Sequence, residues 1–339
     1  MKRTIRLIFL IVFGLVVCSC GNSSNTLKGK DNDFKVKDTA NVDKIFLANK
    51  GNQSVTLIKT GNKWMVNNEF EARPDMIANL LNVVRNVEVK QFVPKTAIEN
   101  TMKLLSVSAT KVEIYVKGKL DKVYYVGGPT QDHFGTYMVM QDAETPYICY
   151  LPGHRGYIST FYTPLADEWR SRQVFRYQLE EIATVRTEFY RLPQLSWEIQ
   201  NVDNKIFKLK SLSTNEFIEP FDTGAVKMVL KEFKALGFES FVTVNDARMD
   251  SVKVKYPLYK ITVLSRDGKK RTLDLFEIPM QPGVYTMDGK EAKVDVDRMY
   301  GIVDGTTTTI CQYFTYDPVA VPITFFMGQK PIGNSYPGR

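Results

Sequence analysis

The sequence predicts an α+β protein in which two tandem repeats each form a mostly antiparallel β-sheet with one amphipathic helix packed on a face. Three observations support this prediction. A helical pattern of apolar residues occurs twice, an alternating strand pair follows it both times, and a tryptophan-containing strand precedes it both times. The corresponding helix and strand residues lie 147 to 149 positions apart. Spacing of this kind indicates an internal repeat.

The two predicted helices share apolar residues at positions i, i+3, i+4, i+7 and i+10, which is typical of a helix with one buried face. In the first helix, Pro74 suits the first helical position and Asp75 the first turn. In the second, Asp222 or Thr223 can cap the start, and Gly237 is expected just after the end. The apolar positions are Ile77, Leu80, Leu81, Val84 and Val87 in the first helix, and Val226, Val229, Leu230, Phe233 and Leu236 in the second.

Alternating apolar and polar residues around a short turn predict a β-hairpin after each helix. Its strands are expected at 112–116 and 123–126 in the first half, and at 259–263 and 272–276 in the second. A further strand is expected to start at Gly135 and, 148 residues later, at Gly283.

The strand before each helix contains a tryptophan, Trp64 in the first half and Trp197 in the second. We interpret the two as equivalent core residues rather than ligand-stacking residues. They lie 133 positions apart, whereas the helices lie 149 apart, so the second half would carry 16 additional residues, within 201–219.

The first 19 residues are organised like a lipoprotein signal peptide. Three basic residues form a positive start, and the apolar stretch 7–17 is too short for a transmembrane helix, which needs about 20 residues. Residues 17–20 (Val-Cys-Ser-Cys) resemble a bacterial lipobox. Cys20 is therefore the predicted site of lipid attachment, and several acyl chains would anchor the protein stably. The alternative is an ordinary signal peptide with incidental cysteines.

Six segments are predicted along the chain. The signal peptide and a polar, flexible tether precede the two α+β repeats, which are separated by a junction. An aromatic extension, expected to add an edge strand or to cover an open sheet edge, ends the chain. The boundaries are 1–19 (signal peptide), 20–40 (tether), 41–163 (first repeat), 164–176 (junction), 177–310 (second repeat) and 311–339 (extension and tail).

Composition argues against nucleic-acid binding. The formal charge of +8 falls to +5 when the three basic residues of the leader are removed, and no run of clustered lysine and arginine is present. Two cysteines remain beyond the leader, Cys149 and Cys311. Export would permit a disulfide between them, but two buried free thiols are the preferred interpretation.

The doubled arrangement resembles a bacterial domain-of-unknown-function family of envelope proteins, over roughly residues 40–305. The matching features are the strand Trp64-Met65-Val66, the paired helices, and the junction residues 169–172 (Trp-Arg-Ser-Arg) followed by a strand starting near Ile182. Members of that family often resemble accessory proteins encoded beside gliding-type ABC transporters. The resemblance therefore implies an accessory role at such a transport system, and it implies no catalytic residues.

The sequence contains no recognisable catalytic or metal-binding motif. His133 and His154 lie in Gly-rich turns without a His-x-x-x-His or Cys-x-x-Cys spacing, whereas a metal site usually takes three or four ligands. Residues 127–130 lack the helix start of a phosphate loop and are interpreted as a strand connection. Asp295 and Asp297 are expected on one solvated face of a strand. We expect no cofactor, no metal and no enzymatic activity, although a spatial Ser-His-Asp triad stays an alternative.

The junction offers the one group of candidate ligand-binding residues. Trp169, Arg170 and Arg172 could clamp an anion or a carbohydrate. The preferred interpretation is that the arginines bridge the two repeats while the tryptophan fills the joint.

These features predict a lipid-anchored, periplasm-facing protein of the bacterial envelope with a non-enzymatic binding or scaffolding role in an envelope complex. It would contact the membrane through acylated Cys20 and a protein partner through its folded body. The alternative is a glycan- or peptide-binding lipoprotein that uses the groove between the two repeats.

Overall fold

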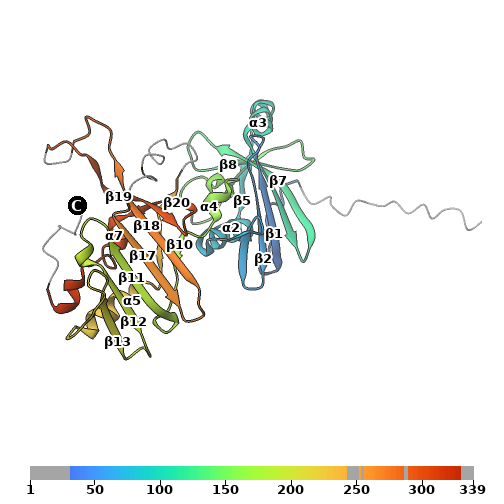
Figure 1. Ribbon diagram of the computed structural model, residues 1–339. Coiled ribbons are helices and arrows are strands. Elements are labelled where there is room, and N and C mark those ends of the chain that lie inside the picture. The colour runs from blue at the N-terminus through green and yellow to red at the C-terminus, as the bar shows by residue number, and fades with distance from the viewer. Residues whose placement is uncertain (1–30, 243–251, 253–255, 286–288, 330–339) are drawn as a thin grey trace, which may run out of the picture. The chain divides into compact units, whose positions relative to one another are not determined.

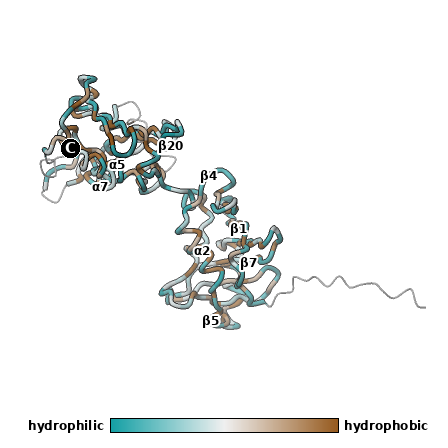
Figure 2. The backbone as a smooth tube through the Cα atoms, turned by 90° about the horizontal axis from the view of Figure 1, so that it is seen from below, coloured by the Kyte–Doolittle hydropathy of each residue, from teal (hydrophilic) through white to brown (hydrophobic). Residues whose placement is uncertain are grey.

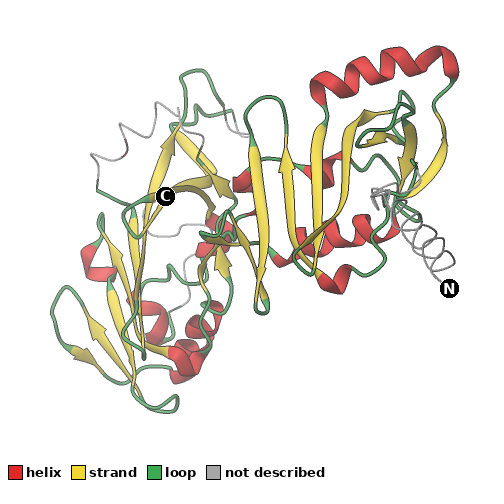
Figure 3. Ribbon diagram, turned by 90° about the vertical axis from the view of Figure 1, so that its right-hand side faces the viewer, coloured by secondary structure: helices red, strands yellow, loops and turns green. Residues whose placement is uncertain are grey.

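The computed structural model describes residues 31–242, 252, 256–285 and 289–329. The chain divides into two units, Met1–Arg170 and Ser171–Arg339. Each unit contains a nine-stranded antiparallel sheet and a few helices. Figures 1 and 3 show the strands of the sheets with helices beside them. The α+β class is therefore confirmed. No helix within the described ranges has the length and apolar content needed to cross a membrane.

The first sheet has the strand order β4-β3-β2-β1-β6-β7-β8-β9-β5. The chain forms a meander from β1 outward to β4, crosses to the opposite edge as β5, and returns beside β1 as β6. The strands are β1 (Val42–Ala48), β2 (Ser54–Thr60), β3 (Lys63–Val66), β4 (Phe70–Glu71), β5 (Glu88–Phe92), β6 (Thr110–Val116), β7 (Lys119–Pro129), β8 (Thr136–Met140) and β9 (Tyr147–Tyr150).

The first unit has two long helices, α2 (Pro74–Asn86) and α3 (Lys95–Ser108). Helix α2 packs on one face of the sheet, and its buried residues are Ile77, Leu80, Val83 and Val84. Leu81, expected in the buried stripe, is only partly buried, because Val83 takes the inward position. Helix α3 packs on the sheet through a separate apolar cluster and was not expected from the sequence.

Residues 33–36 belong to the folded body, so the prediction of a flexible tether up to residue 40 is wrong. Phe34 is 2% exposed and packs edge-on against Tyr124, with ring centroids 5.8 Å apart. Val36 is also buried, and its N–H donates to the carbonyl of Val84 on α2 at 3.0 Å. These two apolar side chains close the core beside α2 because a segment that buries them gains enough free energy to stay ordered. Residues 20–30 lie outside the described residues.

The second sheet has the strand order β14-β13-β12-β11-β17-β18-β19-β20-β16. It repeats the path of the first: a meander of four strands, a crossing to the far edge, and a return. A separate two-stranded sheet joins β10 (Gln173–Phe175) to β15 (Leu236–Gly237). The other strands are β11 (Ile182–Phe189), β12 (Trp197–Asn201), β13 (Phe207–Ser211), β14 (Phe217–Ile218), β16 (Ser240–Phe241), β17 (Tyr259–Ser265), β18 (Lys270–Pro279), β19 (Val294–Val303) and β20 (Thr307–Gln312).

Helix α5 (Thr223–Glu232) covers one face of the second sheet and is shorter than the sequence pattern suggests. The Asp222 carboxylate caps it, as expected, by accepting the N–H groups of Gly224 and Ala225. The prediction that Gly237 follows the helix end is wrong, because Leu236 and Gly237 form β15. A Cβ at Gly237 would lie 2.6 Å from the carbonyl oxygen of Arg172, so only glycine allows this backbone contact.

The two tryptophans are not equivalent, and this part of the repeat prediction is also wrong. Trp64 lies on β3, the third strand of its meander, whereas Trp197 lies on β12, the second strand of the other. By strand register, Trp64 corresponds to Phe207 and Trp197 to Val55. The second unit therefore gains residues in several turns and not in one insertion.

The strand expected from Gly283 is absent from the described residues. Tyr285 forms only an isolated bridge with Glu291, and β19 begins at Val294. The two glycines, Gly135 and Gly283, are therefore not equivalent. Gly135 directly precedes β8, whereas Gly283 lies within the β18–β19 connection, which is longer than the corresponding β7–β8 connection.

Apart from Cys311 and Gln312, which end β20, the aromatic extension forms no strand within its described part, so the first alternative, an added edge strand, is wrong. It forms α7 (Tyr313–Tyr316) and the short 3-10 helix η5 (Ile323–Met327), and most of its apolar side chains enter the core of the second unit. Trp197 donates its indole N–H to the carbonyl of Val321 at 2.7 Å and packs edge-on against Phe326. The first unit closes its core similarly with η2 (Ser159–Tyr162) and α4 (Ala166–Trp169).

Candidate functional site

The best-formed pocket of the first unit lies on the sheet face that α3 covers. Side chains alternate across this sheet, so neighbours in sequence serve different faces. Tyr124 and Met138 point into the core beneath α2, whereas Tyr125 and Val139 face α3. Figure 2 shows both brown, hydrophobic and teal, hydrophilic stretches in the part of the chain that contains α2, β1 and β7.

Helix α3 is held on the sheet at one end by close packing. Leu105 is 6% exposed and packs against Gly127 of β7. A side chain at position 127 would clash with it, because a Cβ there would lie 2.5 Å from Cδ2 of Leu105. Glycine at this point of β7 therefore lets the helix approach the strand. The residues 127–130, predicted as a connection, mostly belong to β7, which continues to Pro129.

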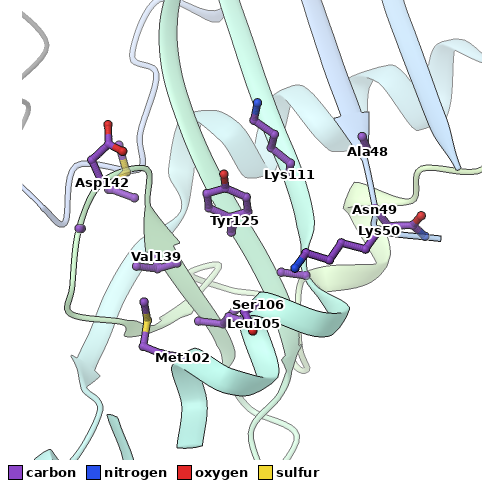
Figure 4. Close-up of a pocket in the computed structure, with 13 residues that line it drawn as sticks. Ala48, Asn49, Lys50, Met102, Leu105, Ser106, Lys111, Tyr125, Val139 and Asp142 are labelled. Carbon is purple, nitrogen blue, oxygen red and sulfur yellow. The ribbon is translucent and has the colours of Figure 1, made fainter. Parts of the chain in front are cut away.

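Around Leu105, residues of α3 and of the sheet line a pocket of about 520 Å³, which we name the α3 pocket. Volumes of this size are typical of small-molecule sites, at about 300–1,000 Å³. Figure 4 shows side chains from α3, β6, β7, β8 and the turn after β1 around it. The lining residues are Ala48, Asn49, Lys50, Met102, Leu105, Ser106, Ala109, Lys111, Tyr125, Val139, Met140, Asp142 and Ala143.

The lining combines apolar side chains from α3 and β8 with a small number of polar side chains from β6 and the neighbouring turns. Lys111 enters from β6 beside Tyr125 on β7, because the two residues are direct cross-strand partners. On the opposite side, Asn49 shapes the turn after β1 through its amide oxygen, which accepts the N–H of Gly51 at 2.9 Å and of Gln53 at 3.2 Å. This turn carries Lys50, which also lines the pocket.

Lys111 is charged and already partnered. Its ammonium lies 2.7 Å from Glu113, which also accepts the Tyr115 hydroxyl at 2.7 Å. The hydrogen bond to Glu113 raises the pKa of Lys111, so the amine stays protonated at neutral pH. Burial raises the pKa of Glu113, but the hydrogen bonds from Lys111 and Tyr115 outweigh it, and the net pKa lies below its usual value. A protonated lysine cannot serve as a nucleophile, so the arrangement suits binding.

The junction residues predicted to bind a ligand or bridge the repeats each have a structural contact within their own unit. Trp169 is fully buried, and its indole N–H donates to the carbonyl of Thr163 at 2.9 Å. The guanidinium of Arg170 lies 3.8 Å from the centre of the Phe70 ring and binds Asp167. Arg172 donates to the carbonyl of Glu239 in the second unit at 2.6 Å. Cys20, the predicted lipid-attachment residue, lies outside the described residues.

The other residues considered for chemistry are dispersed over the two units. His133 and His154 are exposed and contact the rings of Tyr157 and Phe161. Asp295 accepts the backbone N–H groups of Asp297 and Arg298, so it shapes the start of β19. Within the described ranges, no group of three or more His, Cys, Asp or Glu residues is arranged to hold a metal ion.

Cys149 and Cys311 are free, buried thiols, as the preferred interpretation expected. They occupy corresponding positions, because Cys149 on β9 pairs with Thr136 and Cys311 on β20 pairs with Met299 at the same register point of each sheet. Burial raises the pKa of Cys311 to about 11 and that of Cys149 further. Both are therefore unreactive core residues.

Sequence reasoning missed the α3 pocket entirely. Two signals were available: Pro94 before a segment of good helix formers, and the glycine pair Gly127-Gly128 inside a strand, which can mark a close approach of another element. Neither reveals a cavity, which depends on how far the helix lies from the sheet.

Comparison with known proteins gives no relative. No family model matches the chain, and neither a curated protein nor a solved structure shows significant similarity to it.

Proposed function

We propose that this protein is a lipid-anchored component of the bacterial envelope that binds a ligand without transforming it. The α3 pocket is the observation that carries the proposal. It combines apolar side chains with a small number of polar groups, the usual composition of a ligand site. The occupant we propose is an apolar molecule of the size of an acyl chain, held by Met102, Leu105 and Val139.

The two halves, in this proposal, are tandem repeats, each with one amphipathic helix. The identical strand order of the two nine-stranded sheets supports this. So does the register: Ile45 pairs with Leu57 and Ile114, as Val185 pairs with Ile199 and Val263. Duplication accounts for both at once, because strand pairing depends on the alternation of side chains and not on turn length.

Anchoring through Cys20 and a periplasm-facing location rest on the lipobox in the leader. Replacing Cys20 with alanine removes the thiol that would carry the lipid. We expect the Cys20→Ala chain to leave the membrane fraction and to lose incorporation of a clickable fatty acid. Retention of the variant on membranes after a carbonate wash would contradict the anchoring proposal.

Ligand binding at the α3 pocket can be tested with two exposed serines of α3. Ser106 lines the pocket, whereas Ser108 does not, and both hydroxyls donate to a carbonyl of their own helix. With the Cys20→Ala chain and the fluorescent fatty acid cis-parinaric acid, Ser106→Trp should fill the pocket and weaken binding at least about tenfold. Ser108→Trp should leave it unchanged. Equal affinities of the two variants would contradict the proposal.

A partner at an ABC-type transport system is the further part of the proposal. Helix α3 leaves Leu104 and Val107 56% and 71% exposed beside the pocket, which supports a contact with another envelope protein. A photo-crosslinking amino acid at Val107, in cells, should capture that partner for identification by mass spectrometry. The same amino acid at Lys63, which is exposed on β3, serves as the control. Identical products from both positions would argue against a specific contact.

A further inference from the structure

The second unit contains a second pocket, of about 340 Å³, that differs in chemistry from the α3 pocket. It lies where the end of β11, the start of β17, β18 and the start of β19 come together, strands that are neighbours in Figure 1. Two tyrosines, an ion pair and a lysine contribute to its lining. The residues used below are Tyr190, Tyr256, Arg191, Glu277 and Lys293.

The tyrosines form an aromatic platform. The rings of Tyr190 and Tyr256 lie nearly parallel, at 21°, with centroids 5.9 Å apart. Tyr190 follows β11 directly, and its backbone N–H donates to the carbonyl of Leu258 at 3.3 Å, which holds the two segments together. Tyr256 is 85% exposed although it packs on another ring. One face of its ring is therefore supported, and much of its surface is available to a flat ligand.

The ion pair beside the platform is planar and neutral overall. Two N–H groups of Arg191 donate to the two carboxylate oxygens of Glu277, at 2.8 and 2.5 Å. This bidentate geometry fixes both side chains. Each oxygen of Glu277 has a second lone pair, so the carboxylate can accept hydrogen bonds from neighbouring hydroxyl groups. The paired charges of Arg191 and Glu277 give little attraction for an anion or a cation, and Lys293, the other charged residue of the lining, is exposed, so solvent screens its charge.

A flat aromatic face beside fixed hydrogen-bond acceptors matches the two sides of a sugar ring. The axial C–H groups of a pyranose pack on an aromatic face, and its equatorial hydroxyls, which lie around the ring edge, donate to carboxylates. We propose that this pocket binds a neutral saccharide, with Tyr256 as the stacking surface and Glu277 as the hydroxyl acceptor. This proposal is independent of the α3 pocket, because all its residues lie in the second unit.

The test measures binding of chitotetraose and cellotetraose to the full chain in a detergent without a sugar headgroup, by saturation-transfer NMR and calorimetry. At least one of them should bind. Tyr256→Ala should weaken that binding at least about tenfold, and Tyr256→Phe, which keeps the ring, should change it less than about threefold. Tyr285→Ala is the matched control, because Tyr285 is 65% exposed in the same unit but outside the pocket.

Two further variants make the result specific. Glu277→Gln should weaken binding about as much as Tyr256→Ala, and Ser106→Trp should leave it unchanged. The proposal is overturned if neither neutral tetrasaccharide binds, if tetragalacturonate or a tetra-alanine peptide binds in their place, or if Tyr256→Ala and Tyr285→Ala have equal affinity.

Discussion

The two units share one sheet topology, but the faces of their sheets opposite the core helices differ. In the first unit, α3 lies on that face and leaves the α3 pocket at the end of the sheet. In the second unit, Val252 packs there with Phe276, Ile278 and Tyr300. The faces under α2 and α5 are alike because both must bury a continuous core. The opposite face is under no such constraint, and both candidate sites involve residues from it.

The spacing between corresponding residues shows where the two units diverge. Ile114 and Val263 lie 149 positions apart, and so do the buried helix residues Ile77 and Val226, whereas Cys149 and Cys311 lie 162 apart. The increase in spacing falls in the connection between β18 and β19 of the second unit, which corresponds to the connection between β7 and β8 of the first. Turns tolerate added residues because they lie at the surface, whereas a shift within a strand would turn core side chains outward.

The units also close their cores with different parts of the chain. The first uses residues that precede its sheet, including Phe34 and Val36, and residues that follow it, including Trp169. The second uses Phe175 before its sheet and the segment from Tyr313 to Phe326 after it. In each, a fully buried tryptophan indole donates to a backbone carbonyl. The comparison can therefore be tested at these two tryptophans.

The largest expected effect is the removal of either buried indole. Trp169→Ala and Trp197→Ala each create a large cavity, so we expect each to lower the free energy of unfolding of its own unit by about 3–5 kcal/mol. Denaturant titration followed by two-transition analysis measures both units in one experiment. Trp64→Ala, at a half-buried position, is the control and should cost less. Equal losses of unfolding free energy for Trp64→Ala and Trp197→Ala would contradict the expectation that the more deeply buried side chain contributes more.

A smaller effect is expected at the start of the core helices. Asp222 caps α5 with its carboxylate, so Asp222→Ala should destabilise the second unit by about 1 kcal/mol. In the first unit, Arg73 precedes α2 and binds Asp75 on the surface, so Arg73→Ala should cost less than about 0.5 kcal/mol. Thermal unfolding of both variants measures the two losses of stability. A larger loss for Arg73→Ala than for Asp222→Ala would contradict the expected order.

The smallest expected effect concerns pH. Burial raises the pKa of Glu198, but hydrogen bonds from Gln200 and Arg186 outweigh it and lower the net pKa below its usual value. The ionised form is therefore favoured in the folded protein. Its contribution to stability is complete above the unfolded pKa of about 4.3 and disappears as the pH falls through the folded pKa.

Glu198→Gln removes this contribution, so the melting temperature of the second unit should fall less steeply between about pH 5 and pH 3 in the variant. Glu113→Gln is the counterpart in the first unit, where the pKa of Glu113 is lowered by Lys111 and Tyr115. An unchanged slope for Glu198→Gln would show that the Arg186 pair is too well screened to matter.

Both core helices and the central strands that follow them could be predicted from the sequence, because they depend on local periodicity, whereas many of the other strands were not predicted. The strands predicted at 112–116 and 259–263 from alternation lie within β6 and β17, and the helix predicted from the i, i+3, i+4 spacing is α2. The errors include a whole helix, α3, the strand expected from Gly283, and single residues. Gly237 carries the composition of a helix end but forms β15, because a backbone contact with Arg172 decides its place.

The candidate sites could not be predicted. Helix α3 exposes Leu104 and Val107, so its apolar pattern does not mark one buried face, and its pocket depends on the distance between helix and sheet. The pocket of the second unit joins Tyr190 to Glu277, which lie 87 positions apart in the sequence. Only the pairing of β11, β17 and β18 brings them together.

The sequence by itself determined the two core helices, the strands that follow them and the apolar residues available to each core, because each is a property of neighbouring residues. The tertiary structure alone decided which strands correspond, that Phe34 is core rather than tether, and that Trp169 is packing rather than ligand contact. These outcomes depend on contacts between distant segments. The free energy of burying an aromatic ring is gained only where another segment supplies the surface that covers it.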